Sequence, residues 1–116
     1  MADQDGWVEE FPGAITVTSA DGTILAMNRL AAETFAAEGG RTLIGGNVFD
    51  CHPEPARTRT ERLYREQTAN QYPLRKNGKK KIIHQLPWFS GGVFAGFVEI
   101  SLPIPEELPH FNRDAG

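Results

Sequence analysis

The sequence predicts an α+β domain: an antiparallel sheet of five strands, with short helices and one longer helix between the second and third strands. Three two-residue turns, Asp21-Gly22, Asn77-Gly78 and Gly91-Gly92, lie between apolar or alternating segments, as expected for β-hairpins. Helical patterns occupy only the middle of the chain, between the first hairpin and the last three strands. Strands and helices segregated in this way are typical of the α+β class.

The first hairpin is formed by residues 14–19 and 23–27, where Ile15 and Val17 alternate with threonines. Asn28 is placed to cap a short helix over residues 29–36, and Gly39-Gly40 ends it. Residues 42–50 are expected to form a loop with one or two helical turns, because two glycines interrupt their apolar residues. The longer helix follows a proline pair and continues to residue 69.

The last two strands, residues 79–90 and 93–102, form the hairpin around which the fold is organised. A two-residue turn at Gly91-Gly92 predicts the cross-strand pairs by counting. One face then carries the pairs Phe89–Phe94, Pro87–Gly96, Gln85–Val98 and Ile83–Ile100, and the other carries Trp88–Ala95, Leu86–Phe97, His84–Glu99 and Ile82–Ser101. The third strand, residues 71–76, pairs Tyr72 with Ile83 and contains Pro73, which favours an edge position.

The 116 residues suffice for one domain, which we place at residues 13–102. Residues 1–12 are expected to form a cap or arm, and residues 103–116 a proline-rich strap anchored by Ile104, Leu108 and Phe111. The single cysteine, Cys51, excludes an internal disulfide. No apolar run is long enough to cross a membrane and the N-terminus is acidic, so we expect a cytoplasmic protein without membrane contact.

Charge is uneven along the chain: residues 57–81 hold nine of the twelve basic residues and two acidic ones. Such a segment could contact an anionic partner. We expect these side chains to be the solvated positions of one helix and one edge hairpin instead, and we predict no nucleic-acid partner.

The order of elements resembles that of a PAS domain, over roughly residues 11–102. ITVTSADGTILAMN resembles the first PAS hairpin, LIGGNVFD the segment before the longer helix, and GGVFAGFVEIS the final strand. The resemblance implies a PAS-like five-stranded antiparallel sheet that encloses a small-molecule cavity with the short helices. It also implies a stand-alone sensor domain that signals through protein contacts. The Asn-Cys-Arg-Phe-Leu-Gln motif of flavin-binding light sensors is missing, because Cys51 lies in DCHPEP.

Gln85 is the principal candidate for ligand binding, since a lone amide on an apolar inner face needs a hydrogen-bond partner. Tyr72 offers a second polar group, and the predicted lining is completed by Phe49, Phe89, Phe94 and Val98. Backbone groups of the short helices could satisfy Gln85 instead. If Phe89 and Phe94 fill the interior, the domain is a ligand-free interaction module. No nucleophile is paired with a base, so we predict no enzyme activity.

Cys51-His52 is the most reactive pair of side chains in the sequence. His52 could be an axial ligand of haem or a metal ligand, and Cys51 a redox-sensitive thiol. The alternative is a small apolar cysteine and a helix-capping histidine, which we favour, so no cofactor is assigned and haem is not expected. His84 and His110 are not at ligand spacing with this pair.

The outer face of the last hairpin predicts a homodimer. Trp88, Leu86 and Phe97 are expected there, in a patch that is large for a monomer surface. Trp7 and Phe11 of the arm could cover part of this patch, from the same chain or from the partner. A separate signalling protein is the other partner that a sensor would contact.

Overall fold

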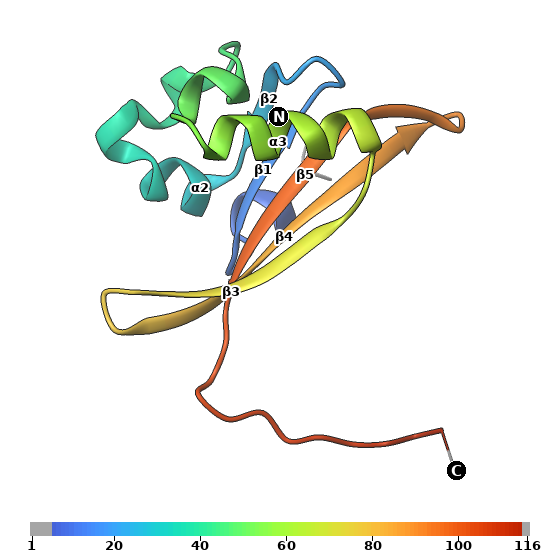
Figure 1. Cartoon of the computed structure of the whole chain (residues 1–116). Coiled ribbons are helices and arrows are strands. Elements are labelled where there is room, and N and C mark those ends of the chain that lie inside the picture. Colours follow the sequence, from blue (N-terminus) through green and yellow to red (C-terminus); the bar gives the residue numbers. More distant parts are fainter. Residues whose placement is uncertain (1–5, 115–116) are drawn as a thin grey trace.

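The computed structural model describes residues 6–114, which form one five-stranded antiparallel sheet with helices on its two faces (Figure 1). The spatial order of the strands is β2-β1-β5-β4-β3. The first hairpin, β1–β2, therefore joins the last three strands through the pairing of β1 with β5. The bounds are β1 Ala14–Thr18, β2 Ile24–Met27, β3 Asn70–Lys76, β4 Lys79–Ser90 and β5 Val93–Pro103. The predicted fold class is confirmed, as is the edge position of β3.

The helical segments between β2 and β3 lie together on one face of the sheet, which we call the inner face (Figure 1). They are α2 Arg29–Thr34, the 3₁₀ turns η2 Ala36–Glu38, η3 Gly40–Leu43 and η4 Val48–Cys51, and the longer helix α3 Ala56–Glu66. A short helix, α1 Gly6–Glu9, lies on the opposite, outer face. None of the helices within residues 6–114 has the length and apolar character that a membrane span requires.

Asn28 joins three segments through one buried side chain, which is 2% exposed. Its Oδ1 accepts hydrogen bonds from the amides of Ile15, at 2.9 Å, and Ala31, at 3.0 Å. Its Nδ2 donates to the carbonyl oxygens of Val8, at 2.9 Å, and Gly13, at 2.8 Å. The predicted helix cap is therefore confirmed, and the same amide also fixes α1 and the start of β1.

The register of the β4–β5 hairpin differs from the predicted one beyond its first two pairs. Ser90 pairs with Val93 and Phe89 with Phe94, but Trp88 pairs with Gly96, so Ala95 is an extra residue in a β-bulge. From there to the end of β5 each pair is displaced by one residue, and Gln85 lies opposite Glu99.

Gly96 makes the bulge possible. Its φ is +141°, a conformation that residues with a side chain rarely adopt. A Cβ atom at this position would also lie 2.0 Å from the Thr18 carbonyl oxygen of β1. The strand therefore bends where it passes the end of β1, and only glycine leaves room for that contact.

The bulge exchanges the two faces of β5 relative to the prediction. Phe97, predicted on the outer face, is 4% exposed and belongs to the interior, so its predicted place in a dimer interface is wrong. Val98, predicted to line the cavity, lies on the outer face instead, because its neighbours in the strand, Phe97 and Glu99, face inward. The expected pair of His84 with Glu99 does not form, because His84 lies opposite Ile100.

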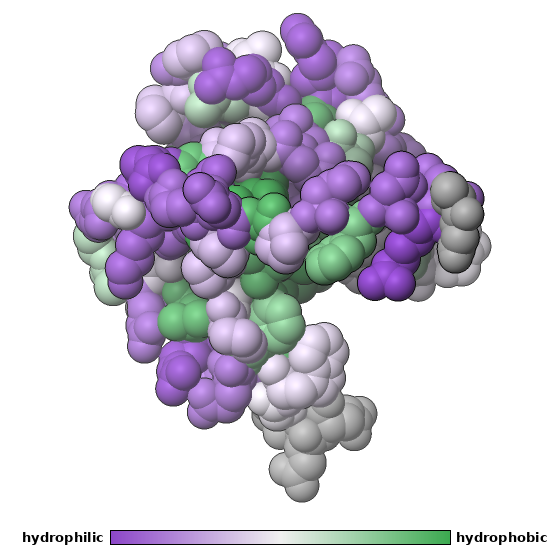
Figure 2. All heavy atoms as spheres, turned by 90° about the horizontal axis from the view of Figure 1, so that it is seen from below, coloured by the Kyte–Doolittle hydropathy of each residue, from purple (hydrophilic) through white to green (hydrophobic). Residues whose placement is uncertain are grey.

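The terminal segments are held by few contacts. Trp7 and Phe11 pack edge to face with centroids 6.3 Å apart, and Trp7 is largely exposed. The segment after β5 extends away from the body of the domain (Figure 1), with Leu108 59% and Phe111 69% exposed. These two side chains are not anchors within the described chain, whereas Ile104 is half-buried and its amide donates to the Lys80 carbonyl oxygen at 3.0 Å. Seen from below, the molecule shows hydrophobic side chains at the centre, bordered by hydrophilic ones (Figure 2).

Replacing Asn28 tests whether this one amide holds the three segments together. Asn28→Ala removes a helix cap and leaves several buried backbone groups without partners, so we expect a loss of about 3 kcal/mol in the free energy of unfolding. Chemical denaturation measures the loss. Asn112→Ala, in the exposed tail, is the matched control and should change stability by less than about 0.5 kcal/mol. Equal effects of the two variants would contradict this role of Asn28.

Candidate functional site

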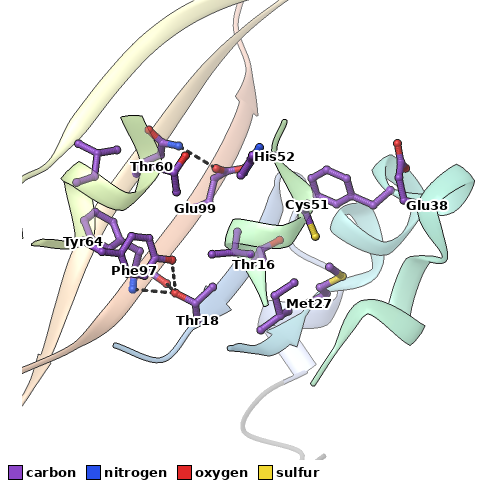
Figure 3. Close-up of a pocket in the computed structure, with 15 residues that line it drawn as sticks. Thr16, Thr18, Met27, Glu38, Cys51, His52, Thr60, Tyr64, Phe97 and Glu99 are labelled. Carbon is purple, nitrogen blue, oxygen red and sulfur yellow. Dashed lines mark hydrogen bonds between the residues drawn. The ribbon is translucent and has the colours of Figure 1, made fainter. Parts of the chain in front are cut away.

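A pocket of about 140 Å³ lies between the inner face of the sheet and the helices (Figure 3). Strands β1, β2, β4 and β5 form one side, and η2, η4, α3 and Phe35, which follows α2, contribute the other. Most of its lining is apolar or carries hydroxyl groups. The lining residues are Thr16, Thr18, Ile24, Met27, Phe35, Glu38, Val48, Cys51, His52, Thr60, Leu63, Tyr64, Gln85, Phe97 and Glu99.

Tyr64 of α3 is the centre of an aromatic cluster at one end of the pocket. Its ring lies 4.5 Å from that of Phe97 and 4.9 Å from that of Phe49, measured between centroids. Phe94 lies further from Tyr64, at 6.3 Å. The predicted cavity residues Phe49 and Phe94 thus support the wall of the pocket rather than line it. Phe89 is 51% exposed near the turn of the hairpin and lies outside the pocket.

The polar end of Tyr64 is bonded within the protein. Its hydroxyl lies 2.5 Å from Thr18 Oγ1, which also accepts a hydrogen bond from the Phe97 amide at 3.2 Å. Burial raises the pKa of the Tyr64 phenol, and the Thr18 hydrogen bond offsets part of this rise. Tyr64 is therefore neutral at physiological pH and fixes α3 against β1 and β5.

Glu99 and His52 lie beside each other in the pocket (Figure 3), and with Gln85, which bonds to Glu99, they form a polar corner. The Gln85 side chain donates from Nε2 to Glu99 Oε2 at 3.2 Å, and its Oε1 accepts from Asn70 at 2.8 Å. Gln85 thus reaches the pocket as predicted, and side chains of β3 and β5 satisfy its amide. Burial raises the pKa of the Glu99 carboxyl, while the Gln85 hydrogen bond and the nearby imidazole of His52 act in the opposite direction.

A wider cleft of about 640 Å³ adjoins this corner, between α3 and the strands β3 and β4. It shares His52, Thr60, Leu63 and Gln85 with the pocket. Tyr72, predicted to be a polar group of the cavity, lines this cleft instead, and burial raises the pKa of its phenol. Arg59 and Arg62 of α3 also line the cleft, so its walls are more basic than those of the pocket.

Cys51 and His52 are the candidate metal ligands of the sequence. Among residues 6–114, no three His, Cys, Asp or Glu side chains converge on one point. Desolvation raises the pKa of the Cys51 thiol, and the charges of Asp50 and Glu38 raise it further, which disfavours a reactive thiolate. His52 lines both the pocket of about 140 Å³, which is close in volume to a cavity that holds benzene, and the adjoining cleft of about 640 Å³.

Sequence reasoning missed Glu99, Phe97, Tyr64 and Thr18 as residues of the site. Glu99 and Phe97 were assigned to the wrong face because the bulge was not anticipated. A glycine inside a strand, such as Gly96, is the signal that could have indicated it. Nothing in the sequence indicates that Tyr64 and Thr18 meet, because 46 residues separate them.

Glu99 makes stability depend on pH in a defined direction. A carboxyl whose pKa is higher in the folded state than in the unfolded state binds more protons when folded. Its contribution is therefore favourable below the unfolded pKa and is lost as the pH rises through the folded pKa. Glu99→Gln keeps the shape of the side chain but cannot ionise, so it removes this loss of stability at high pH.

We accordingly expect Glu99→Gln to melt above the unmodified chain at about pH 8 and no higher at about pH 4. A gain of about 1 kcal/mol would raise the melting temperature by roughly 4 °C. Circular dichroism measures both temperatures. Glu38→Gln, at an exposed acid on the rim of the pocket, should show no such pH-dependent gain. The interpretation fails if Glu99→Gln gives the same difference at both pH values.

Solved structures share this fold at low sequence identity. The PAS domain of the histidine kinase ThkA is 17% identical, with a TM-score of 0.62 over 78% of this chain and 97% of that one. The Aer2 receptor of Vibrio cholerae, described as a dual PAS-heme oxygen sensor, is 14% identical, with a TM-score of 0.55 over 80% and 95%. VqmA of Vibrio cholerae, solved bound to DPO, is 13% identical, with a TM-score of 0.64 over 88% of this chain and 57% of VqmA.

No family model matches the sequence, and no curated protein matches it. The likeness to solved structures therefore concerns the fold. This chain has a PAS-like fold.

Proposed function

We propose that the chain is a sensor domain that binds a small molecule in the 140 Å³ pocket and signals through protein contacts. The pocket carries the proposal. It combines an apolar wall with a few convergent polar groups, which is the usual composition of ligand sites. Both the sheet and α3 contribute to the pocket, so a bound molecule would alter the contacts between them.

The structural neighbours support a sensor role. Aer2 is described as a haem oxygen sensor, and VqmA has been solved with DPO bound. Here the size of the pocket favours a molecule much smaller than haem. We propose no enzyme activity, since no nucleophile in the described pocket is paired with a base.

A ligand-free interaction module is the second candidate, and the aromatic cluster favours it. Tyr64, Phe49, Phe94 and Phe97 fill much of the space between α3 and the sheet with the protein's own side chains. In that case the domain would act only by dimerising or docking.

The outer face of the sheet is the proposed dimer interface. Leu86 and Trp88 of β4 lie there, beside Val98 and Ile100 of β5. Trp88 extends across β5, because its Nε1 donates to the Thr18 carbonyl oxygen at 3.0 Å. Trp7 and Phe11 of the N-terminal segment are the remaining apolar groups that could complete the interface, and Phe97 has no part in it.

Native mass spectrometry of freshly purified protein tests the first candidate. We expect a retained small molecule, and a smaller retained fraction in Gln85→Leu, because that variant loses a polar group of the pocket. Gln71→Leu, an exposed change on the neighbouring strand, is the control and should retain the molecule. Protein that carries no retained molecule and gains no stability from any member of a metabolite library would favour the ligand-free module.

Sedimentation velocity at high micromolar concentration tests the dimer. We expect the unmodified chain to sediment as a dimer and Leu86→Glu as a monomer, because a charge at the centre of an apolar interface must be desolvated. Val93→Glu, at the exposed tip of the same hairpin, should remain dimeric. A monomeric unmodified chain would exclude the outer-face dimer.

A further inference from the structure

The Glu99 carboxylate is half-buried and has few partners within the protein. Its Oε2 accepts one hydrogen bond, from the neutral Gln85 amide. Its Oε1 is not among the buried unpartnered atoms of residues 6–114, so this oxygen is accessible from the pocket. The lining of the pocket also contains no lysine or arginine, and His52 is the nearest group that can carry a positive charge.

A buried carboxylate is costly unless a cation or several donors compensate it. The protein could have supplied such a partner from α3, which carries several arginines, but Arg59 and Arg62 line the outer cleft and not the pocket. A compensating group can therefore come from a ligand that occupies the pocket next to Glu99.

The other walls restrict what can carry that group. A volume of about 140 Å³ is close to the roughly 150 Å³ of a cavity that binds benzene, so one six-membered ring fits. The rings of Tyr64 and Phe97 lie to one side of Glu99 and the thioether of Met27 to the other (Figure 3), and these groups suit an aromatic ring.

We propose that the pocket selects one-ring aromatic amines, with the ammonium group bound at Glu99 and the ring held against Tyr64 and Phe97. This inference rests on the proposed function, since it names the ligand class of the same pocket. The ammonium donates to the accessible Oε1 in a charge-assisted hydrogen bond, which is about twice as strong as a neutral one. Arg59 and Arg62 would affect the rate of entry more than the bound state, because they line the cleft outside.

Benzylamine and benzyl alcohol are matched probes, since they differ only in an ammonium group against a hydroxyl group. Ligand-observed saturation-transfer NMR on the full chain, at a pH near neutral, gives a dissociation constant for each. We expect the unmodified protein to bind benzylamine at least about tenfold more tightly than benzyl alcohol.

Two variants assign the preference to Glu99. Glu99→Gln should bind both probes with similar affinity, and Glu38→Gln, which removes the exposed acid of the pocket rim, should keep the preference. Melting temperatures show that each variant is folded. The comparison of the two probes on the unmodified chain needs no variant and stands even if Glu99→Gln fails to fold.

The outcomes separate this inference from the proposed function. Equal binding of the two probes to the unmodified chain overturns the selectivity and leaves the pocket as a small-molecule site. A preference that survives in Glu99→Gln overturns the assignment to Glu99. If neither probe binds, this inference fails, whereas the proposed sensor function is still decided by the native mass spectrometry and metabolite-library test.

Discussion

The close approach of Gly96 to the Thr18 carbonyl oxygen is the constraint on which the interior of this domain depends. A strand with a side chain at position 96 could not pass the end of β1 at this distance. The bulge that results turns Phe97 and Glu99 inward and leaves Val98 and Ile100 outside. Thr18 reinforces the arrangement, because its hydroxyl group bonds to both Tyr64 and the Phe97 amide. The helix α3, the bulge and the end of β1 are thus fixed by one group of contacts.

Most of the fold could be predicted from the sequence, because local signals determine its elements. Two-residue turns at Asn77-Gly78 and Gly91-Gly92 join strands, the loop at Asp21-Gly22 has three residues between Ser19 and Thr23, and Asn28 caps a helix. Counting from Asn77-Gly78 gave the observed pair of Tyr72 with Ile83, since no bulge interrupts that hairpin. The same procedure failed in the next hairpin, because one extra residue is invisible to counting.

The candidate site was less predictable, since it depends on contacts between distant segments. Gln85 was placed correctly because it lies on β4, the strand without the extra residue. Glu99 and Phe97 lie beyond the bulge, and each was assigned to the face opposite to its true one. Tyr64 and Thr18 meet only through the packing of α3 on the sheet, which no periodicity encodes. Because the predicted register was wrong by one residue, the predicted pocket lacked Glu99, the only charged group on the inner face of β5.

The bonds of Asn28 differ in how much of the chain each one restrains. Three of them tie β1 to α2, whereas the bond to Val8 restrains α1 alone. Beyond that bond, α1 and the residue after it are held by the surface ion pairs Glu9–Arg41 and Glu10–Arg29. Detachment of this segment would leave the sheet and the pocket intact. We therefore expect the segment to open locally, at a free-energy cost far below that of global unfolding. Since Trp7 and Phe11 are proposed to complete the dimer interface, detachment of α1 would remove apolar contacts from that interface while it leaves the sheet in place.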